Sequence, residues 1–178
     1  TRMERCIMIV TNDTYKDTQK TLSTSKTWVI DVETNGLHPY GMNQICGLGI
    51  CSADGELPFN YYFPFRHQQG ENLSEEARQD IISWLNEIPS TLIGYNIKFD
   101  LHFLAKEGLV IDSQKLIDVL VMVRLTEHTS VRDLGLTDAI TRSFGEEAAS
   151  YDIETKKYLR DNKWNKDFSM APPDILGE

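Results

Sequence analysis

The sequence predicts an α/β fold in which a central mixed sheet is flanked by helices. Three apolar runs rich in β-branched and aromatic residues follow one another within residues 28–65, and turn residues separate them. After residue 73, apolar residues at helical spacing alternate with one further short apolar run. The first pattern favours an antiparallel meander and the second favours parallel strands joined through helices, so the sheet is expected to be mixed.

Length and composition favour one globular domain. The chain has 178 residues, of which 40% are hydrophobic and 10% aromatic, so it can bury a core and differs from disordered chains. No apolar run approaches the roughly 18 residues that a membrane span needs, and the apolar patch at 6–10 is too short for a secretory signal. The 3 cysteines, an odd number in apolar surroundings, indicate reduced thiols. We therefore expect a cytoplasmic protein that does not enter a membrane.

The first half of the chain is expected to supply most of the strands. Residues 1–26 read as an N-terminal lead-in, with a strand or extended segment followed by a short helix. Residues 27–178 are expected to form the main domain. Its central strand spans 28–33, and further strands span 43–51 and 57–65.

The second half is expected to alternate helices with one strand. Ser74 is a favoured N-cap, and apolar residues at 81, 82 and 85 supply the buried stripe of the helix that follows it. A strand at 91–93 comes next, and then a helix at about 99–107. Asp118 caps or begins another helix, and the chain after residue 133 is mostly helical and charged.

Two carboxylates lie at the end of the central strand. Asp31 and Glu33 are two positions apart, so on a strand they point to the same face. Like charges buried side by side are costly unless a cation lies between them. Their hard oxygen ligands would favour magnesium or manganese. The alternative is that both lie at a solvated strand end and bind nothing.

A second polar cluster follows the strand at 91–93. Asn96 falls in the strand-to-helix turn, and Asp100 falls in the first turns of the helix. Each has an ordinary explanation, because Asn is common in turns and the helix dipole favours an acid near the N-terminus. Their occurrence together with Asp31 and Glu33 favours a shared site.

The two motifs, Asp-x-Glu at 31–33 and Asn-x-x-Phe-Asp at 96–100, together resemble the first two motifs of the DEDD 3′–5′ exonuclease superfamily. More narrowly, most of the chain from residue 28 onward resembles the proofreading domain of family A DNA polymerases, the bacterial polymerase I type. This resemblance implies a ribonuclease H-like fold, a single-stranded 3′ end of DNA as substrate, and a polymerase domain in the same parent chain. It extends to segments 52–56, 61–64 and 116–120.

The resemblance also implies the catalytic residues. The 3′-terminal phosphodiester would be hydrolysed with two metal ions, Mg²⁺ or Mn²⁺, and Asp31, Glu33 and Asp100 would be the catalytic acids and metal ligands.

Further residues are implied at the substrate. Asn96 would orient the sugar or the backbone of the nucleic acid. Leu37, with Phe99 or Phe103, would wedge or stack against the terminal bases, although core packing explains the two rings at least as well. Asp118 is a second-rank site candidate, because an acid that begins a helix is more often structural.

A fourth acid is implied but not found. The family places it in a Tyr-x-x-x-Asp or His-x-x-x-x-Asp motif near the end, with Tyr or His as general base. Tyr158 and Asp161 are one residue too close together. Asp152 and Glu154 lie in a Lys-rich stretch with no strand before it, so solvated helix surface explains them better. We expect the fourth acid beyond Glu178, which would make this chain an incomplete exonuclease domain and could leave it inactive.

Two alternatives stay open. One is a ribonuclease of the same superfamily, related to ribonuclease D, and the other is a catalytically silent scaffold domain. The presence of both acidic motifs argues against the scaffold. A net charge of −9 is unusual for a nucleic-acid binder, which generally carries a basic face. A neighbouring domain could supply most of the affinity for a duplex.

Overall fold

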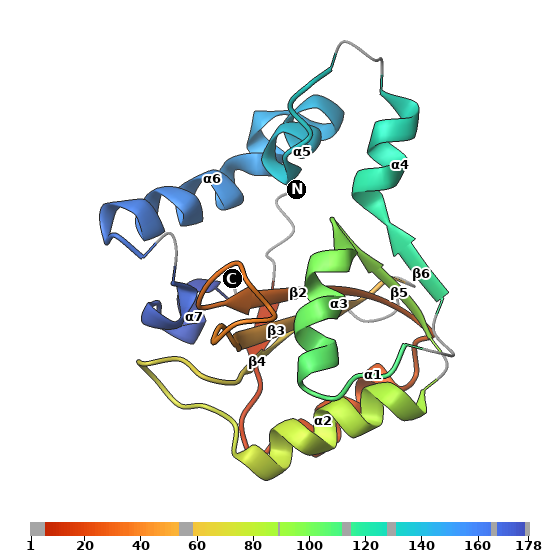
Figure 1. The fold of residues 1–178 in the computed structure, drawn as a ribbon, viewed down its shortest axis with the longest axis vertical. Helices are drawn as coiled ribbons and strands as arrows, with labels where there is room; N and C mark the ends of the chain where they lie inside the picture. The colour runs from red at the N-terminus through yellow and green to blue at the C-terminus, as the bar shows by residue number, and fades with distance from the viewer. Residues whose placement is uncertain are drawn as a thin grey trace.

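The computed structural model describes residues 6–53, 59–88, 90–111, 115–127, 131–164 and 167–176. Its centre is a six-stranded sheet (Figure 1). The third strand across the sheet, β3 (Ile45–Ser52), pairs antiparallel with both of its neighbours, and the other three pairings are parallel. The predicted α/β class, with a meander and added parallel strands, is therefore confirmed. The strands in spatial order are β1 (Cys6–Ile9), β4 (Phe59–Pro64), β3 (Ile45–Ser52), β2 (Thr27–Thr34), β5 (Thr91–Gly94) and β6 (Lys115–Asp118).

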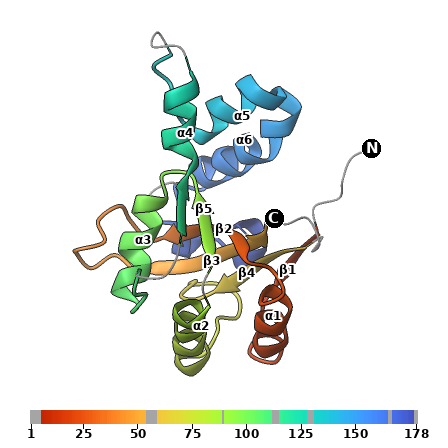
Figure 2. The same cartoon turned by 90° about the vertical axis from the view of Figure 1, so that its right-hand side faces the viewer.

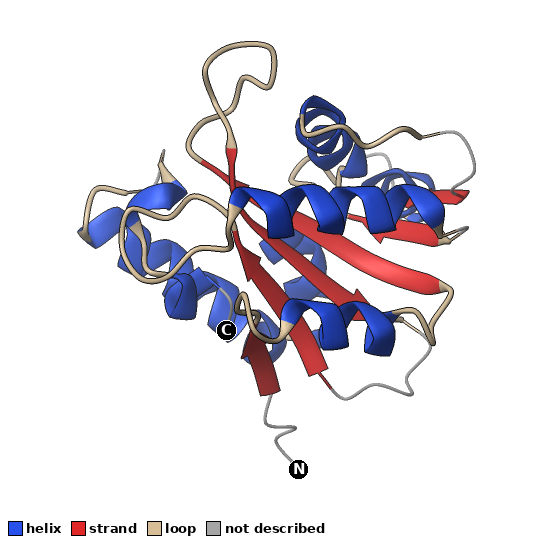
Figure 3. Ribbon diagram, turned by 90° about the horizontal axis from the view of Figure 1, so that it is seen from below, coloured by secondary structure: helices blue, strands red, loops and turns tan. Residues whose placement is uncertain are grey.

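Helices cover both faces of this sheet. Figure 2 shows α1 and α2 on one side and α5 and α6 on the other, and Figure 3 shows helices lying across the near face. A short 3₁₀ turn, η1, contacts β2 and β3. The helical segments are α1 (Tyr15–Leu22), α2 (Glu75–Glu87), α3 (Ile97–Lys106), α4 (Val119–Thr126), α5 (Leu136–Phe144), α6 (Glu146–Asp161), η1 (Phe168–Met170) and α7 (Pro173–Leu176).

The core lies between the sheet and the layer of α1, α2 and α3. Alternation along β2 buries Trp28, Ile30 and Val32 on this side, as period two requires. The Trp28 ring stacks on Trp84 of α2 with centroids 5.0 Å apart, and its indole N–H donates to the Leu22 carbonyl at 3.2 Å. The other face of β2 is thereby left for polar residues.

The structure shifts several predicted boundaries. The segment predicted as a lead-in contributes β1, which pairs with β4, and α1, whose Leu22 is fully buried in the core. Strand β6, which pairs with β5, was not expected, and α3 begins two residues earlier than predicted. Ser74 does cap α2, accepting from the Ala77 N–H at 3.1 Å. Residues 54–56 of the predicted hairpin turn, and 57–58 of the predicted third strand, lie outside the described residues.

Among the described residues, no helix combines the length and the apolar character that crossing a membrane requires.

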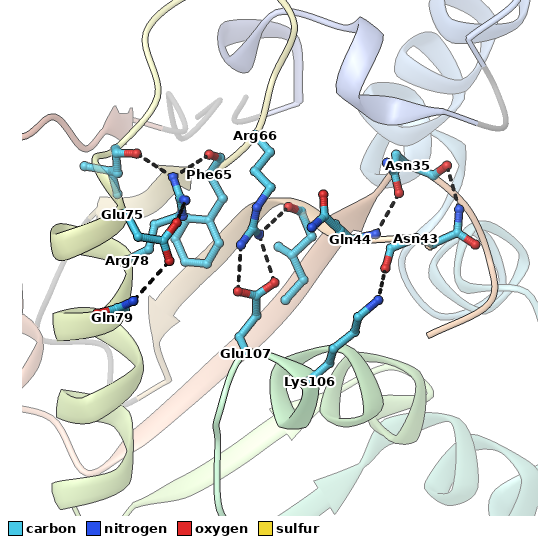
Figure 4. Close-up of polar contacts among 12 residues, drawn as sticks. Asn35, Asn43, Gln44, Phe65, Arg66, Glu75, Arg78, Gln79, Lys106 and Glu107 are labelled. Carbon is cyan, nitrogen blue, oxygen red and sulfur yellow. Dashed lines mark hydrogen bonds and ion pairs between the residues drawn. The ribbon is translucent and has the colours of Figure 1, made fainter. Parts of the chain in front are cut away.

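An ion pair fastens the end of α3 to the meander. The Arg66 guanidinium donates to both Glu107 carboxylate oxygens at 2.8 Å and to the Ile45 carbonyl at 3.2 Å (Figure 4). Both side chains are mostly buried, and the planar fork of arginine matches a carboxylate in two hydrogen bonds. The pair therefore fixes where α3 ends relative to the start of β3.

We predict that Glu107→Gln lowers the free energy of unfolding by about 1.5–3 kcal/mol, because the guanidinium keeps its burial but loses its charged partner. Glu75→Gln is the matched control, since Glu75 pairs with Arg78 but is 63% exposed and should cost at most about 1 kcal/mol. Urea unfolding of both variants measures the difference. Equal losses would show that the buried pair has no special structural role.

Candidate active site

Asp31 and Glu33 share the face of β2 that points away from the core. The register with β3 places Gly49 opposite Asp31 and Gly47 opposite Glu33. The strand beside the two acids therefore carries no side chain on this face. The register also shifts between Glu33 and Thr34, and such bulges are frequent next to functional sites. The outcome is a bare strip of backbone beside two carboxylates.

Tyr62 of β4 fills part of this strip. A Cβ atom on Gly47 would lie only 1.8 Å from the Tyr62 hydroxyl, so the glycine is needed for the ring to lie there. The hydroxyl is 2.9 Å from Nε2 of the buried His67, whose Nδ1 is 2.7 Å from the Ala171 carbonyl. A carbonyl only accepts, so Nδ1 carries the proton and Nε2 accepts from Tyr62. Burial lowers the pKa of His67, which favours this neutral form.

A hollow of about 200 Å³ opens on the same face. Asp31 and Tyr62 line it together with Cys51 of β3 and Leu176 of α7. The C-terminal helix α7 therefore lies beside the carboxylate face of the sheet.

Strand β5 stops early and makes room for α3. Its register with β2 runs from Thr27 to Val29. Gly94 ends the strand, where a Cβ would lie 2.9 Å from the Ile97 side chain. Asn96 then adopts a left-handed conformation (φ 59°, ψ 42°), which asparagine tolerates better than most residues. This turn starts α3 directly beside the uncovered end of β2.

Asp100 uses the space that β5 leaves. Its Oδ1 accepts from the Val32 backbone N–H at 2.9 Å, at the position between Asp31 and Glu33. The residue is 3% exposed. A side chain from α3 thus takes the place of the next β5 residue and brings a third carboxylate to the pair on β2.

Burial and neighbouring acids raise the pKa values of all three carboxyl groups. Burial raises the pKa of Asp31 to about 6, and burial followed by the charge of Asp31 raises that of Asp100 to about 7. The pKa of Glu33 is well above its usual range, first from burial and then from the charges of Asp31 and Asp100. Asp31 is accessible to solvent, so water weakens the effect there more than at Asp100. The negative charges of the three acids are therefore not balanced by nearby positive charge.

Asp152 of α6 also faces this cluster, and sequence reasoning missed it. Its charge is the second cause of the raised pKa of Asp31, and it also acts on Glu33. Lys156 donates to Asp152 at 2.8 Å and opposes the rise at Glu33. Thr137 of α5 also donates to Asp152. The assignment of Asp152 to solvated helix surface is therefore corrected.

A usable signal for Asp152 was absent from the sequence. The family motif needs Tyr or His four or five positions earlier, and those positions hold Ala148 and Glu147. Only the packing of α6 over the sheet brings Asp152 toward the acids.

Asp118 has a structural role. Its Oδ1 accepts from the Leu120 N–H at 2.9 Å, which caps α4, and from the Asn96 N–H at 3.0 Å. It therefore holds the left-handed turn before α3 in place. It acts on the cluster only as a minor contribution to the raised pKa of Asp100.

The predicted substrate residues differ in exposure. Leu37 is 74% exposed, and Asn96 is also exposed. Phe99 is partly buried against the core, while Phe103 is fully buried, 5.0 Å from Phe99 between ring centroids. Stacking of Phe103 on a base is therefore corrected to core packing, because neither face of its ring is available.

The donor chemistry fits a hard divalent cation. Asp31, Glu33 and Asp100 offer carboxylate oxygens whose mutual repulsion a cation would relieve. Within the described parts of the chain, however, no three His, Cys, Asp or Glu side chains already stand as a closed metal cage. A bound ion would therefore have to draw these carboxylates closer together.

Comparison with solved structures identifies the fold. The chain matches Trypanosoma brucei RNase D in a GMP complex with a TM-score of 0.68 and 12% identity, over 98% of this chain and 54% of that one. It matches the Aedes aegypti Nibbler EXO domain with a TM-score of 0.57 and 13% identity, over 78% of this chain and 68% of that one. It matches Brucella melitensis NrnC with a TM-score of 0.53 and 16% identity, over 89% of this chain and 84% of that one. The chain has a ribonuclease H-like fold.

At these identities the likeness concerns the fold alone. No protein-family model matches the sequence, and no curated protein matches it significantly. The neighbouring structures share the fold that the resemblance implies, and those named here are not described as family A polymerase domains. The chain spans about half of the RNase D chain in the GMP complex.

We predict that Asp100→Asn makes stability less dependent on pH. Between about pH 4 and 7 folded Asp100 keeps a proton that the unfolded chain has lost, so stability falls as the pH rises through this range. The upper bound of this loss is about 4 kcal/mol, at about 1.4 kcal/mol per pH unit between the two pKa values. Asparagine keeps the oxygen that accepts from Val32, so above pH 7 the variant should be more stable than the parent.

Urea unfolding at pH 5 and pH 8, with a chelator present, measures this. The exposed Asp161→Asn serves as control and should leave the pH dependence unchanged. A variant that is equally destabilised at both pH values would contradict the assigned charge repulsion.

Proposed function

We propose that this protein is a metal-dependent 3′–5′ exonuclease that acts on the end of a single-stranded nucleic acid. The observation that carries the proposal is the convergence of Asp100, from α3, on Asp31 and Glu33 of β2. A nuclease fold without converging acids would support only a scaffold. The neighbouring structures described as RNase D, as an EXO domain and as a nuclease support the same class.

Asp31, Glu33 and Asp100 would hold Mg²⁺ or Mn²⁺. Such an ion, when bound, lowers the pKa of water and stabilises charge on phosphoryl oxygens. One structural neighbour, Brucella melitensis NrnC, is described with bound Mg²⁺. Two ions are part of the proposal and follow from the resemblance.

The chain's own residues prepare this site. The Val32 N–H holds Oδ1 of Asp100 at the position between Asp31 and Glu33. Asp118 fixes the turn at Asn96, and the exposed Asn96 amide would orient the sugar or backbone. Gly49 leaves space beside Asp31 for the terminal nucleotide, whereas the Tyr62 ring occupies the space over Gly47.

DNA is the proposed substrate, with a polymerase domain in the same parent chain, because the two motifs resemble those of family A proofreading domains. RNA is the second candidate. It is favoured by the match to RNase D structures, one of which is described in complex with RNA U12.

We predict stepwise shortening of a 5′-labelled single-stranded oligonucleotide from its 3′ end in Mg²⁺ or Mn²⁺, and none with a chelator. Asp31→Asn and Asp100→Asn should each lower the rate more than about 100-fold, since even residues behind metal ligands cost about 10–100-fold. Gel electrophoresis of the products measures the rate, and Asp161→Asn is the exposed-acid control.

Calorimetric binding of Mn²⁺ tests the site without cleavage. Binding that Asp31→Asn weakens supports the metal site even if this chain does not cleave, and absence of such binding favours the scaffold. Asp152→Asn separates the two sources of the fourth acid. A loss of Mn²⁺ affinity equal to that of Asp31→Asn would assign it to Asp152, whereas an unchanged affinity would favour an acid beyond Glu178.

Matched DNA and RNA oligonucleotides of the same sequence decide the substrate. We expect faster trimming of DNA, with kcat/KM as the measured quantity. Faster trimming of RNA would replace the proofreading proposal with a ribonuclease D-like one.

A further inference from the structure

The loop at 35–44, between β2 and β3, is held rigidly by polar contacts. At its base the Asn35 N–H donates to the Gln44 carbonyl at 3.2 Å, and the Gln44 N–H donates to the Asn35 side chain at 2.7 Å. The Asn43 amide donates to the Asn35 carbonyl at 3.1 Å and accepts from the His38 N–H at 3.3 Å. Gly36 leaves the space that the Asn43 amide occupies, because a Cβ there would lie 2.1 Å from its nitrogen.

Helix α3 fastens the tip of this loop. The Lys106 ammonium donates to the Gly41 carbonyl at 2.8 Å. It also donates to the Asn43 carbonyl at 2.7 Å (Figure 4). The same helix carries Asp100. The loop and the third acid are therefore positioned by one element.

The loop nevertheless presents its large apolar side chains to solvent. Leu37, Tyr40 and Met42 are 74%, 84% and 93% exposed. Ordering a loop costs conformational entropy, and here burial of these side chains does not offset it. Exposed apolar groups on an ordered loop are typical of binding surfaces.

Tyr40 is also oriented by a partner. Its hydroxyl lies 2.8 Å from Nδ1 of His102, with the ring centroids 5.3 Å apart in an edge-on arrangement. His102 lies two residues after Asp100 on α3. The hydrogen bond limits rotation of the ring while leaving most of its surface exposed.

We propose that Tyr40, held by His102, is a stacking platform for a base next to the scissile end of a single-stranded nucleic acid, with Leu37 and Met42 flanking that base. This inference rests on the proposed function. The loop starts directly after Thr34, at the end of the strand that carries Asp31 and Glu33. In this proposal the strand leaves those acids past the start of α3, and the nucleotides next to its scissile end reach the loop.

The small size of the patch favours a base over a protein partner. The chain has a net charge of −9, so phosphate contacts cannot supply much affinity, and a base has to bind here through stacking, which does not depend on charge. Three side chains are also far fewer than the roughly 20–30 residues that each partner contributes to a stable protein interface.

The test is binding of a short single-stranded oligonucleotide with 2-aminopurine as its penultimate base, in Ca²⁺. Stacking on Tyr40 should quench its fluorescence. Tyr40→Ala should remove the quench and raise Kd about tenfold, within the range that stacking on one aromatic ring supplies. Tyr40→Phe and His102→Ala keep the ring but lose its orientation, and should raise Kd about 2- to 3-fold. Phe144→Ala, which removes another exposed aromatic (77% exposed), should change neither quantity.

The outcomes separate this inference from the proposed function. Cleavage that persists with an unchanged KM and an unquenched signal in Tyr40→Ala would overturn the platform and leave the exonuclease standing. A Tyr40-dependent quench in a protein that does not cleave would support the platform and count against the exonuclease. Failure of the parent protein to bind the oligonucleotide would overturn the platform in favour of another partner.

Discussion

The arrangement of the site depends on one hydrogen bond, from the Val32 N–H to Asp100. β5 is too short to pair with this part of β2, so the Val32 N–H needs another acceptor. A carboxylate from α3 supplies it, and in doing so enters the space between two other acids. Had β5 continued by three residues, a backbone carbonyl would satisfy the same donor and Asp100 would have no place beside β2. The early end of one strand thus permits the cluster.

The cluster of acids lowers the stability of the ion-free protein and offers a binding site for a cation. Three carboxylates whose pKa values are raised by burial and by neighbouring acids are an unfavourable arrangement in an ion-free protein. When a divalent cation binds, each carboxylate is attracted to the cation, and this attraction offsets the repulsion between the carboxylates. The large excess of acids over the whole chain works in the same direction at longer range, and it makes weak phosphate contacts an expected property of this domain.

Local patterns in the sequence predicted what depends on neighbouring residues. Period two placed Asp31 and Glu33 on one face, and the turn at Asn96 placed Asp100 at the start of a helix. Local patterns could not predict features that depend on how elements pack. Helical spacing made Phe99 and Phe103 equally good candidates for stacking on a base, and only the structure shows which ring is buried. Asp152 reaches the cluster through the placement of α6, which no local pattern encodes. The pairing of Gly47 and Gly49 with the two acids depends on strand register in the same way.

The bridge from Tyr62 through His67 to Ala171 allows one tautomer of the imidazole. If His67 takes up a proton, both of its nitrogens become donors, and the Tyr62 hydroxyl can then only accept from Nε2. Its own hydrogen must then turn away from His67, on the face of the sheet that carries Asp31 and Glu33. Acidification would therefore change the Tyr62 hydroxyl from a donor to an acceptor toward His67, beside the hollow that Asp31 lines, without moving the backbone.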